Sequence, residues 1–379
     1  MSKKLFTVIS LVIVAVFLFS ACTPKATEAP VVEEPEVEET EVEEMEEVEE
    51  TEAPVVETEA AEAKLKVCNV NDMGGVDDKS FNATAWKGVL DAEAKYGIEG
   101  SFLESEQQTD YEKNINSYLA EGDCAIIIGI GYNISAATKA AAEANPDQKF
   151  GMIDDAYDPI LPNVAGSVYN IDQATYLLGY LAASQTKTGI LGTYVGMLFP
   201  STANFMDGFY NGMMKYNEVH GTSVRLIGWD PATYSGLEVG NFTDVDKGKT
   251  ITLGLLDEGA DIIMPVAGPV GAGTLAAVKE RGALMVGVDT DWSVLYDADS
   301  AYVLGSALKR MDFWLLNTVG TVVDGTFTGN TFVGTLENEG VGIAVGVDFQ
   351  DTIDPAILAE IEQLQADIIA GTIVTTYAR

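Results

Sequence analysis

The sequence predicts an α/β protein whose folded part consists of two similar lobes, each with a mostly parallel β-sheet covered by helices. Short apolar runs alternate with longer amphipathic segments along residues 64–379, which is the pattern of repeated β–α units. The runs at residues 125–128 and 262–264 are continuously apolar, as expected of parallel strands buried on both faces. The folded part has 316 residues, too many for one hydrophobic core and enough for two.

Hydrophobic periodicity places the elements in order along the chain. Most expected strands are short apolar runs followed within two residues by Gly, Asn or Asp, and the expected helices repeat apolar residues every three or four positions. We expect strands at residues 65–70, 98–104, 124–130, 150–154, 164–169, 189–197, 224–229, 261–266, 284–288, 302–304 and 341–345. We expect helices at residues 80–96, 111–120, 135–144, 171–186, 203–219, 246–258, 271–281, 310–323 and 355–369.

Residues 1–21 have the layout of a secretory signal. Lys3 and Lys4 precede an apolar run at residues 5–19, which is shorter than the roughly 20 residues that a spanning helix needs. Ser20-Ala21-Cys22 follows and resembles a bacterial lipobox, so we expect Cys22 to carry lipid and become the mature N-terminus. An uncleaved membrane anchor is the alternative. Both readings place the rest of the chain outside the cytoplasm.

Residues 22–63 are predicted to form an acidic disordered tether. From residue 26 to residue 63 there are 17 Glu and no Lys or Arg. Repulsion between like charges, together with scattered prolines, prevents a packed core. A flexible chain of this length has a root-mean-square span of roughly 35 Å, which is enough to hold a folded domain away from a membrane surface.

Composition excludes several kinds of partner and site. The chain carries 59 acidic and 21 basic residues, and 42 acidic and 18 basic residues remain once residues 1–63 are set aside. Nucleic acid and anionic membrane surfaces are therefore poor partners. His220 is the only histidine, and a single histidine is too few for a histidine-based metal site and leaves little basis for a catalytic triad. We expect no metal and no cofactor.

Cys68 and Cys124 both fall in predicted strands with apolar neighbours. We expect buried free thiols, and a bridge between adjacent strands is the alternative.

The loop between the first strand and the first helix combines residue types that suit a binding cleft. Residues 71–82 include two glycines, three acids, a lysine and two asparagines, and Phe81 and Trp86 add flat apolar faces. In an open α/β sheet such a loop lies outside the carboxyl end of a strand, where ligands bind.

Other strand ends carry complementary groups. Asp154 and Asp289 each follow an apolar strand, Gly268 lies in a glycine-rich turn, and Lys309 precedes a helix. Taken singly, such an acid is often only a helix cap and such a turn often serves close packing. The turn also lacks the Gly-Lys-Ser/Thr of a nucleoside triphosphate loop. Together, the carboxylates suit sugar hydroxyls, and aromatic rings such as Phe205 suit a planar base. A core position for Phe205 is the alternative.

These residues resemble a known family. The run Gly75-Val76-Asp77-Asp78-Lys79-Ser80-Phe81-Asn82, with Ala85-Trp86-Lys87-Gly88, is similar to the opening signature of the basic membrane protein family. Its members are substrate-binding lipoproteins of ABC transporters and include purine nucleoside receptors. The blocks Val266-Ala267-Gly268, Gly287-Val288-Asp289-Thr290-Asp291 and Leu308-Lys309-Arg310 follow in the family's order.

The resemblance implies a type I periplasmic-binding fold, with two Rossmann-like lobes joined by a three-strand hinge and closing on the ligand. Lobe I would comprise residues 64–170 and 303–327, and lobe II residues 171–302 and 328–379. By the same resemblance, Asp289 and Lys309 would bind ribose hydroxyls, Asp154 a polar edge of the ligand, and Trp86 the face of the base. Asp77 stands where many members have Asn, so it would accept a hydrogen bond from the base. The expected ligand contacts are Asp77, Phe81, Asn82, Trp86, Asp154, Phe205, Gly268, Asp289 and Lys309.

The leading hypothesis is a receptor tethered to the cell membrane that delivers a nucleoside, of purine type, to an ABC permease. The second hypothesis keeps the fold and changes the ligand to riboflavin or another heteroaromatic solute. The third is a nucleoside hydrolase, because acids alone can run glycosidic chemistry.

Overall fold

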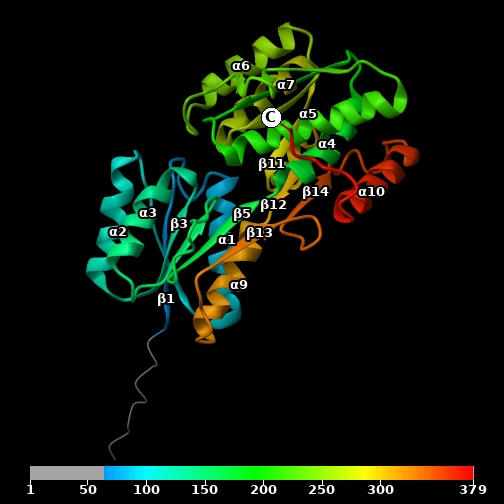
Figure 1. The fold of residues 1–379 in the computed structure, drawn as a ribbon. Helices are drawn as coiled ribbons and strands as arrows, with labels where there is room; N and C mark the ends of the chain where they lie inside the picture. Colours follow the sequence, from blue (N-terminus) through cyan, green and yellow to red (C-terminus); the bar gives the residue numbers. More distant parts are fainter. Residues whose placement is uncertain (1–63, 379) are drawn as a thin grey trace, which may run out of the picture. The chain divides into compact units, whose positions relative to one another are not determined.

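Two six-stranded β-sheets organise residues 64–378, the part of the chain that the computed structural model describes (Figure 1). The first sheet has the order β13 (Asn330–Gly334), β5 (Val164–Tyr169), β4 (Phe150–Ile153), β3 (Cys124–Ile130), β1 (Lys66–Val70) and β2 (Glu99–Leu103). The second has the order β14 (Val341–Val345), β12 (Val303–Lys309), β11 (Leu284–Asp289), β10 (Ile262–Val266), β6 (Ile190–Val195) and β7 (Arg225–Ile227).

Both sheets are built mainly from parallel strands. All neighbouring strands of the first sheet run parallel. In the second sheet β14 runs antiparallel to β12, and the other pairs are parallel. The prediction of two α/β lobes with parallel sheets is therefore confirmed.

Helices cover both faces of each sheet. In the first lobe, α1 (Phe81–Tyr96) packs beside α9 (Met311–Val323), and α2 (Thr109–Glu121) packs beside α3 (Ser135–Ala144). In the second lobe the pairs are α4 (Ile171–Gln185) with α5 (Pro200–His220) and α6 (Val245–Asp257) with α7 (Gly271–Arg281). The C-terminal α10 (Pro355–Ile369) packs on α4.

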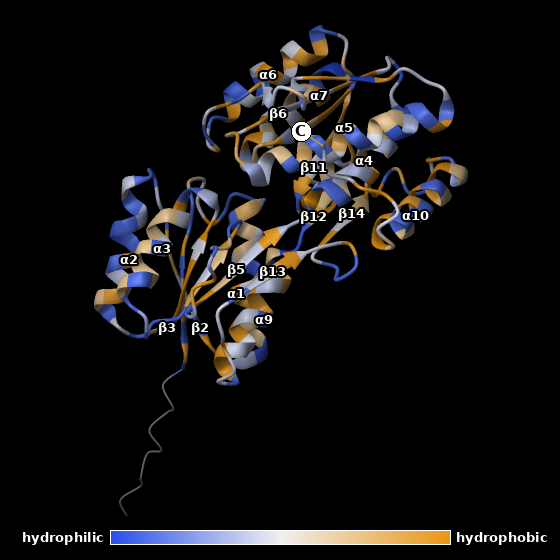
Figure 2. Ribbon diagram, in the orientation of Figure 1, coloured by the Kyte–Doolittle hydropathy of each residue, from blue (hydrophilic) through white to orange (hydrophobic). Residues whose placement is uncertain are grey.

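Side chains that alternate along a strand contribute to separate hydrophobic cores on the two faces of the sheet. On β3, Ile126 and Ile128 join one buried cluster, whereas the intervening Ile127 joins another. Successive side chains of a strand point to opposite faces, so a continuously apolar strand fills both layers. In Figure 2 apolar, orange stretches predominate in the strands, whereas hydrophilic, blue residues recur along the helices that surround them.

Three segments pass between the lobes. They join β5 to α4, β12 to α9, and β13 to β14. Backbone hydrogen bonds tie them together: the Asn170 N–H donates to the Gly334 carbonyl over 2.9 Å, and the Arg310 N–H donates to the Gly340 carbonyl over 3.0 Å. This arrangement confirms the predicted three-strand hinge.

Strand pairing differs from the expected division of the C-terminal segment between the lobes. We expected residues 303–327 in lobe I, yet β12 pairs with β11 in the second sheet. We expected residues 328–379 in lobe II, yet β13 pairs with β5 in the first. The strand expected at residues 302–304 extends to Lys309. The prediction was too short because Gly305 and Ser306 interrupt the apolar pattern, although they do not break the strand. The edge strand β13 is largely exposed and has no apolar run, so periodicity did not reveal it.

Glycines allow α5 to lie directly against α4. A Cβ atom on Gly212 would lie 1.8 Å from the Tyr176 carbonyl oxygen, and one on Gly208 would lie 2.3 Å from that of Asp172. Any larger side chain would therefore push the two helices apart. This close contact fixes the position of α5, whose first turns reach the cavity described below.

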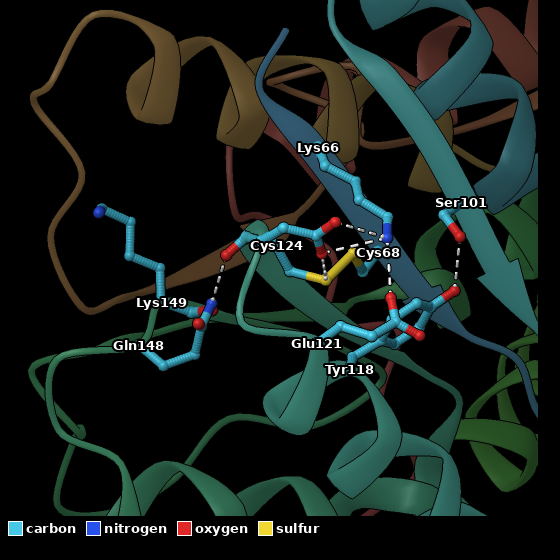
Figure 3. Close-up of a disulfide and its surroundings, with 9 residues drawn as sticks. Lys66, Cys68, Ser101, Tyr118, Glu121, Cys124, Gln148 and Lys149 are labelled. Carbon is cyan, nitrogen blue, oxygen red and sulfur yellow. Dashed lines mark hydrogen bonds and ion pairs between the residues drawn. A yellow bond between two sulfur atoms is a disulfide. The ribbon is translucent and has the colours of Figure 1, made fainter. Parts of the chain in front are cut away.

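Cys68 and Cys124 form a disulfide, so the expectation of free thiols was wrong (Figure 3). Cys68 lies within β1 and Cys124 begins the adjacent β3, and their Cα atoms are 5.9 Å apart. This separation is within the usual range for a bridge. Beside the bridge, Lys66 Nζ contacts carboxylate oxygens of Glu121 at 2.9 Å and Asp123 at 3.1 Å.

The predicted signal, Cys22 and the acidic tether lie outside the described residues. Within residues 64–378, no helix combines the length and the apolar composition that crossing a membrane requires.

Candidate functional site

A cavity lies at the carboxyl ends of strands from both sheets. It encloses about 590 Å³ of space not filled by protein atoms, its open mouth included. The first lobe contributes residues that follow β1, β3 and β4, and the second contributes residues at the ends of β10, β11 and β12 and on α5. Seven of the expected contact residues line it: Phe81, Asn82, Asp154, Phe205, Gly268, Asp289 and Lys309.

Two of these residues have a left-handed backbone although they are not glycines. Asp154 directly follows β4 with φ 76°, and Asp289 ends β11 with φ 69°. Few non-glycine residues adopt this conformation, and Asp and Asn tolerate it best. Backbone strain of this kind concentrates at ligand sites. In both lobes the chain therefore turns sharply where a carboxylate enters the cavity.

Lys309 is almost fully buried and forms an ion pair with Asp154. Their side chains are 3% and 8% exposed, and Nζ contacts Oδ1 of Asp154. Three rings surround the ammonium: its distance to the ring centroid is 5.0 Å for Phe81, 5.2 Å for Tyr169 and 5.8 Å for Phe205. These are distances at which an aromatic face attracts a cation. Lys309 thus joins the acids and the aromatic residues of the two lobes in one cluster.

Asp289 is buried, with 6% of its surface exposed, and a residue of the first lobe binds its carboxylate. The hydroxyl of Ser80 donates a 2.8 Å hydrogen bond to Oδ2 of Asp289. Burial raises the pKa of Asp289 to about 6, and Lys309 and the Ser80 hydrogen bond oppose that rise. A carboxylate in this setting is a strong acceptor for ligand hydroxyls that replace the water it has lost.

Asp78, which the sequence did not single out, caps α1. Its carboxylate accepts hydrogen bonds from the backbone N–H groups of Ser80 at 2.8 Å, Asn82 at 2.9 Å and Ala83 at 3.0 Å. Burial raises the pKa of Asp78, and these hydrogen bonds oppose the rise. Asp78 therefore anchors the start of the helix that carries Phe81 and Asn82 into the cavity.

Asp77 does not reach the cavity, contrary to the expectation that it meets the base. It is exposed and absent from the lining. Its neighbour Asp78 takes the inward position because it must satisfy the N–H groups at the start of α1. The substitution of Asp for Asn at residue 77 therefore carries no argument about the ligand.

Trp86 is also displaced from its expected role as a stacking face. It is absent from the cavity lining, and its ring packs edge-on against Phe102 of β2, with centroids 5.0 Å apart. Trp86 follows Phe81 by five residues on α1, which separates the two side chains by about 140° around the helix. Because Phe81 faces the cavity, Trp86 faces the sheet.

Several lining residues were missed by sequence reasoning. Tyr132 of the first lobe meets Phe199 of the second with ring centroids 5.1 Å apart, and Phe242 lies 6.4 Å from Phe199. Asp72 follows β1 and accepts hydrogen bonds from the Met73 N–H and the Tyr111 hydroxyl. Its place after the first strand was the available signal, whereas the aromatic residues follow no motif.

Two polar atoms of the cavity wall are buried without a partner among the described residues. They are Oδ1 of Asn82 and Oγ of Ser201, and both residues line the cavity. A buried polar group without a hydrogen bond is destabilising by about 1–3 kcal/mol. A ligand that offers a donor to Asn82 and an acceptor to Ser201 would relieve this deficit.

Comparisons with known proteins agree with this geometry. The model of the family described as ABC transporter substrate-binding protein PnrA-like matches residues 65–377. The ABC transporter nucleoside-binding protein BmpA of Lactococcus lactis is 30% identical over 329 residues, which cover 82% of this chain and 88% of that protein. Basic membrane protein A of Borreliella burgdorferi is 31% identical over 226 residues, 59% of this chain and 62% of that protein. The crystal structure of an ABC transporter solute-binding protein from Aeropyrum pernix superposes with a TM-score of 0.74 at 25% identity, covering 83% of this chain and 94% of that one.

Proposed function

Since the chain belongs to the family of PnrA-like ABC transporter substrate-binding proteins, we propose that it binds a nucleoside in the cavity between its lobes and delivers it to the importer's permease. Membership in this family confirms the resemblance carried by residues 75–88, and the two-lobed architecture is that of solute-binding proteins. The identity of the ligand is the part of the proposal that rests on the chain's own residues.

The observation that carries the proposal is the cluster of Asp154, Asp289 and Lys309 in one cavity, with the Lys309 ammonium 5.0 Å from the ring centroid of Phe81 and 5.8 Å from that of Phe205. Carboxylates accept the two hydroxyls of a ribose, and an ammonium donates to the same oxygens. Aromatic faces stack on a planar base with roughly 1–3 kcal/mol per base. A nucleoside presents both chemistries in one molecule. Its base would lie against Phe81 and Phe205, and its ribose would lie toward Asp289 and Lys309.

The charge of the cavity favours an uncharged ligand. Among the described residues, the lining carries the carboxyl groups of Asp72, Asp78, Asp154 and Asp289 against the ammonium of Lys309. A phosphate group would meet repulsion from these acids in a partly desolvated site. The proposed ligand is therefore the nucleoside rather than the nucleotide. The relative from Lactococcus lactis, whose name includes nucleoside binding, supports the same class.

The proposed location follows from the N-terminal sequence. Lipid on Cys22 would anchor the protein at the extracytoplasmic face of the cell membrane, and residues 22–63 would tether the lobes near the permease. A relative from Pyrococcus abyssi that is 27% identical is named a lipoprotein, which supports this arrangement. Metabolic labelling with a radioactive fatty acid tests it: wild type should carry the label and Cys22→Ala should not.

A thermal melt in the presence of ligand tests the nucleoside proposal. Guanosine, inosine or adenosine at millimolar concentration should raise the melting temperature, because a ligand that binds only the folded state stabilises it by mass action. Uridine and free ribose serve as comparisons for the base and the sugar. The absence of a shift with every nucleoside would contradict the proposal.

A larger heteroaromatic solute is the second candidate. The rings of Tyr132, Phe199 and Phe242 extend the aromatic lining beyond Phe81 and Phe205, and a tricyclic flavin would use this additional surface. The absorbance spectrum of the purified protein distinguishes the two ligands. A yellow protein that releases riboflavin on denaturation would favour the flavin.

We infer that the protein acts by binding rather than by turnover, as its family of substrate-binding proteins implies. Release of hypoxanthine from inosine above the uncatalysed background would instead support a nucleoside hydrolase.

A further inference from the structure

We propose that Ser80 is a positioning residue whose hydroxyl, carried by the first lobe, fixes the carboxylate of Asp289 in the second lobe, so that lobe closure and ligand binding depend on one another. The ligand named in this inference rests on the proposed function. The contact between the two side chains does not.

The hydroxyl of Ser80 is free for this role because another residue caps the helix. Ser80 occupies the N-cap of α1, where a serine side chain usually accepts a hydrogen bond from the first turn. Here the Ser80 side chain makes no capping bond. Asp78 accepts from three backbone N–H groups of the turn instead. The serine oxygen is thereby released to donate its proton across the cleft.

The contact joins residues far apart in the chain and deep in the protein. Ser80 is 0% exposed and Asp289 6% exposed, and 209 positions separate them in sequence. Ser80 does not line the cavity, whereas Asp289 does. The bond to Ser80 occupies Oδ2 of Asp289, which leaves Oδ1 for a ligand hydroxyl. Ser80 thus acts on the ligand through Asp289.

The neighbouring residue strengthens the link between the lobes. Lys79 has a left-handed backbone with φ 55°, and its ammonium lies 5.5 Å from the ring centroid of Tyr296 in the second lobe. The Lys79–Ser80 pair therefore meets the second lobe at two points. Opening of the cleft would break both contacts and expose the Asp289 carboxylate to water.

The charged groups around Asp289 determine how its pKa would respond to loss of the Ser80 hydroxyl. Lys309 faces it from β12, and Asp154 and Asp78 face it from the first lobe. Burial and the two acids raise the pKa of Asp289, while Lys309 and the Ser80 hydrogen bond lower it. Ser80→Ala would remove one of the two stabilising partners of the carboxylate. Asp289 should then hold its proton to a higher pH and accept ligand hydroxyls less well.

A titration of ligand-free protein tests the contact directly. The pKa of Asp289 can be followed by carboxyl ¹³C NMR in the full-length chain, assigned with Asp289→Asn. Ser80→Ala should raise that pKa by roughly one unit. Thr193→Val is the control, because it removes a buried hydroxyl that donates to the Met264 carbonyl within the second lobe alone. The inference is overturned when Ser80→Ala and Thr193→Val leave the pKa of Asp289 equally unchanged.

A binding cycle tests the consequence for the ligand, with guanosine as the probe. Ser80→Ala should weaken guanosine binding roughly tenfold and move the acid limb of the affinity–pH curve upward, and Thr193→Val should do neither. In an Asp289→Ala background, Ser80→Ala should have no further effect. Equal losses with and without Asp289 would show that Ser80 acts elsewhere and would contradict the inference. A wild-type protein that binds no nucleoside would instead contradict the proposed function, and the titration would still decide the role of Ser80.

Discussion

Asp154 and Asp289 occupy equivalent positions in the two lobes. Asp154 follows β4 and Asp289 ends β11, and these are the third strands in the two sheet orders. Both residues have a left-handed backbone, with φ of 76° and 69°. The repeated architecture therefore brings one carboxylate from each lobe to the same cavity. Each acid also has its partner in the other half of the site: Asp154 pairs with Lys309, and Asp289 accepts from Ser80.

Replacing Asp289 by Asn should stabilise the free protein at neutral pH while weakening nucleoside binding. The pKa of Asp289 is about 6 in the folded protein and near 4 in an unfolded chain. The raised pKa favours folding when the group is protonated, so this contribution is complete below about pH 4 and is lost as the pH rises through about 6. Above that pH the buried charge opposes folding by roughly 2–3 kcal/mol.

Denaturant unfolding at pH 4 and pH 8 checks this prediction. Asp289→Asn should increase the free energy of unfolding at pH 8 and leave it unchanged at pH 4. Asp291→Asn is the matched control, because Asp291 caps the short helix α8 (Trp292–Leu295) and Asn caps a helix about as well as Asp. Equal effects of the two substitutions at pH 8 would contradict the assignment of a strained, buried charge to Asp289.

Phe81 and Trp86 should separate binding from stability. Phe81→Ala removes a ring from the cavity and should weaken nucleoside binding by roughly 1–3 kcal/mol. Trp86→Ala removes the contact with Phe102 and should lower the free energy of unfolding by about 3 kcal/mol without changing affinity. Calorimetric titration and denaturant unfolding of both variants measure the two quantities. A loss of affinity in Trp86→Ala that matches the loss in Phe81→Ala would restore Trp86 as a stacking residue.

A phosphate group on the ligand should abolish tight binding. Guanosine monophosphate should bind at least about a hundredfold more weakly than guanosine, because the phosphate would approach several carboxylates and a single ammonium in a site of reduced dielectric. Titration of wild type with both compounds at the same ionic strength gives the ratio. Comparable affinities would contradict this prediction and would mean that the phosphate stays outside the cavity or pairs with a basic side chain other than Lys309.

The Cys68–Cys124 bridge should contribute substantially to stability. It closes a loop with a sequence separation of 56 residues, which corresponds to about 4 kcal/mol in the chain-entropy model. Cys68→Ser/Cys124→Ser should therefore unfold at lower denaturant concentration than wild type, with guanosine binding retained after refolding. Reducing agent should shift wild type toward the double variant and leave the double variant unchanged. A bridge that is absent would give no response to the reductant in either protein.

Much of the fold could be predicted from sequence because the apolar patterns are strong. The runs that form β3, β10 and β11 are buried on both faces, and their positions were predicted to within one residue. The edge strand β13 has mostly exposed residues, so its sequence lacks the apolar pattern that predicts a buried strand. Its place in the first sheet depends on pairing with β5, more than 160 residues earlier in the chain.

The candidate site also has residues that the sequence predicted and residues that it did not. Asp154, Asp289 and Lys309 lie where parallel strands end, and that rule places them at one edge of each sheet without further information. Asp77 and Trp86 were misplaced because helix phase and capping decide which of several adjacent polar or aromatic residues turns inward. Ser80 and Tyr132 were missed because their partners, Asp289 and Phe199, belong to the other lobe.

Isothermal titration of the ligand-free protein with guanosine, inosine and adenosine measures directly whether the cavity binds a nucleoside. We expect saturable binding of one molecule per chain for at least one of these nucleosides, with affinity strongly reduced in Asp289→Ala. The absence of measurable binding for all of them at millimolar concentration, in a protein that is folded, would contradict the assignment of the cavity to a nucleoside.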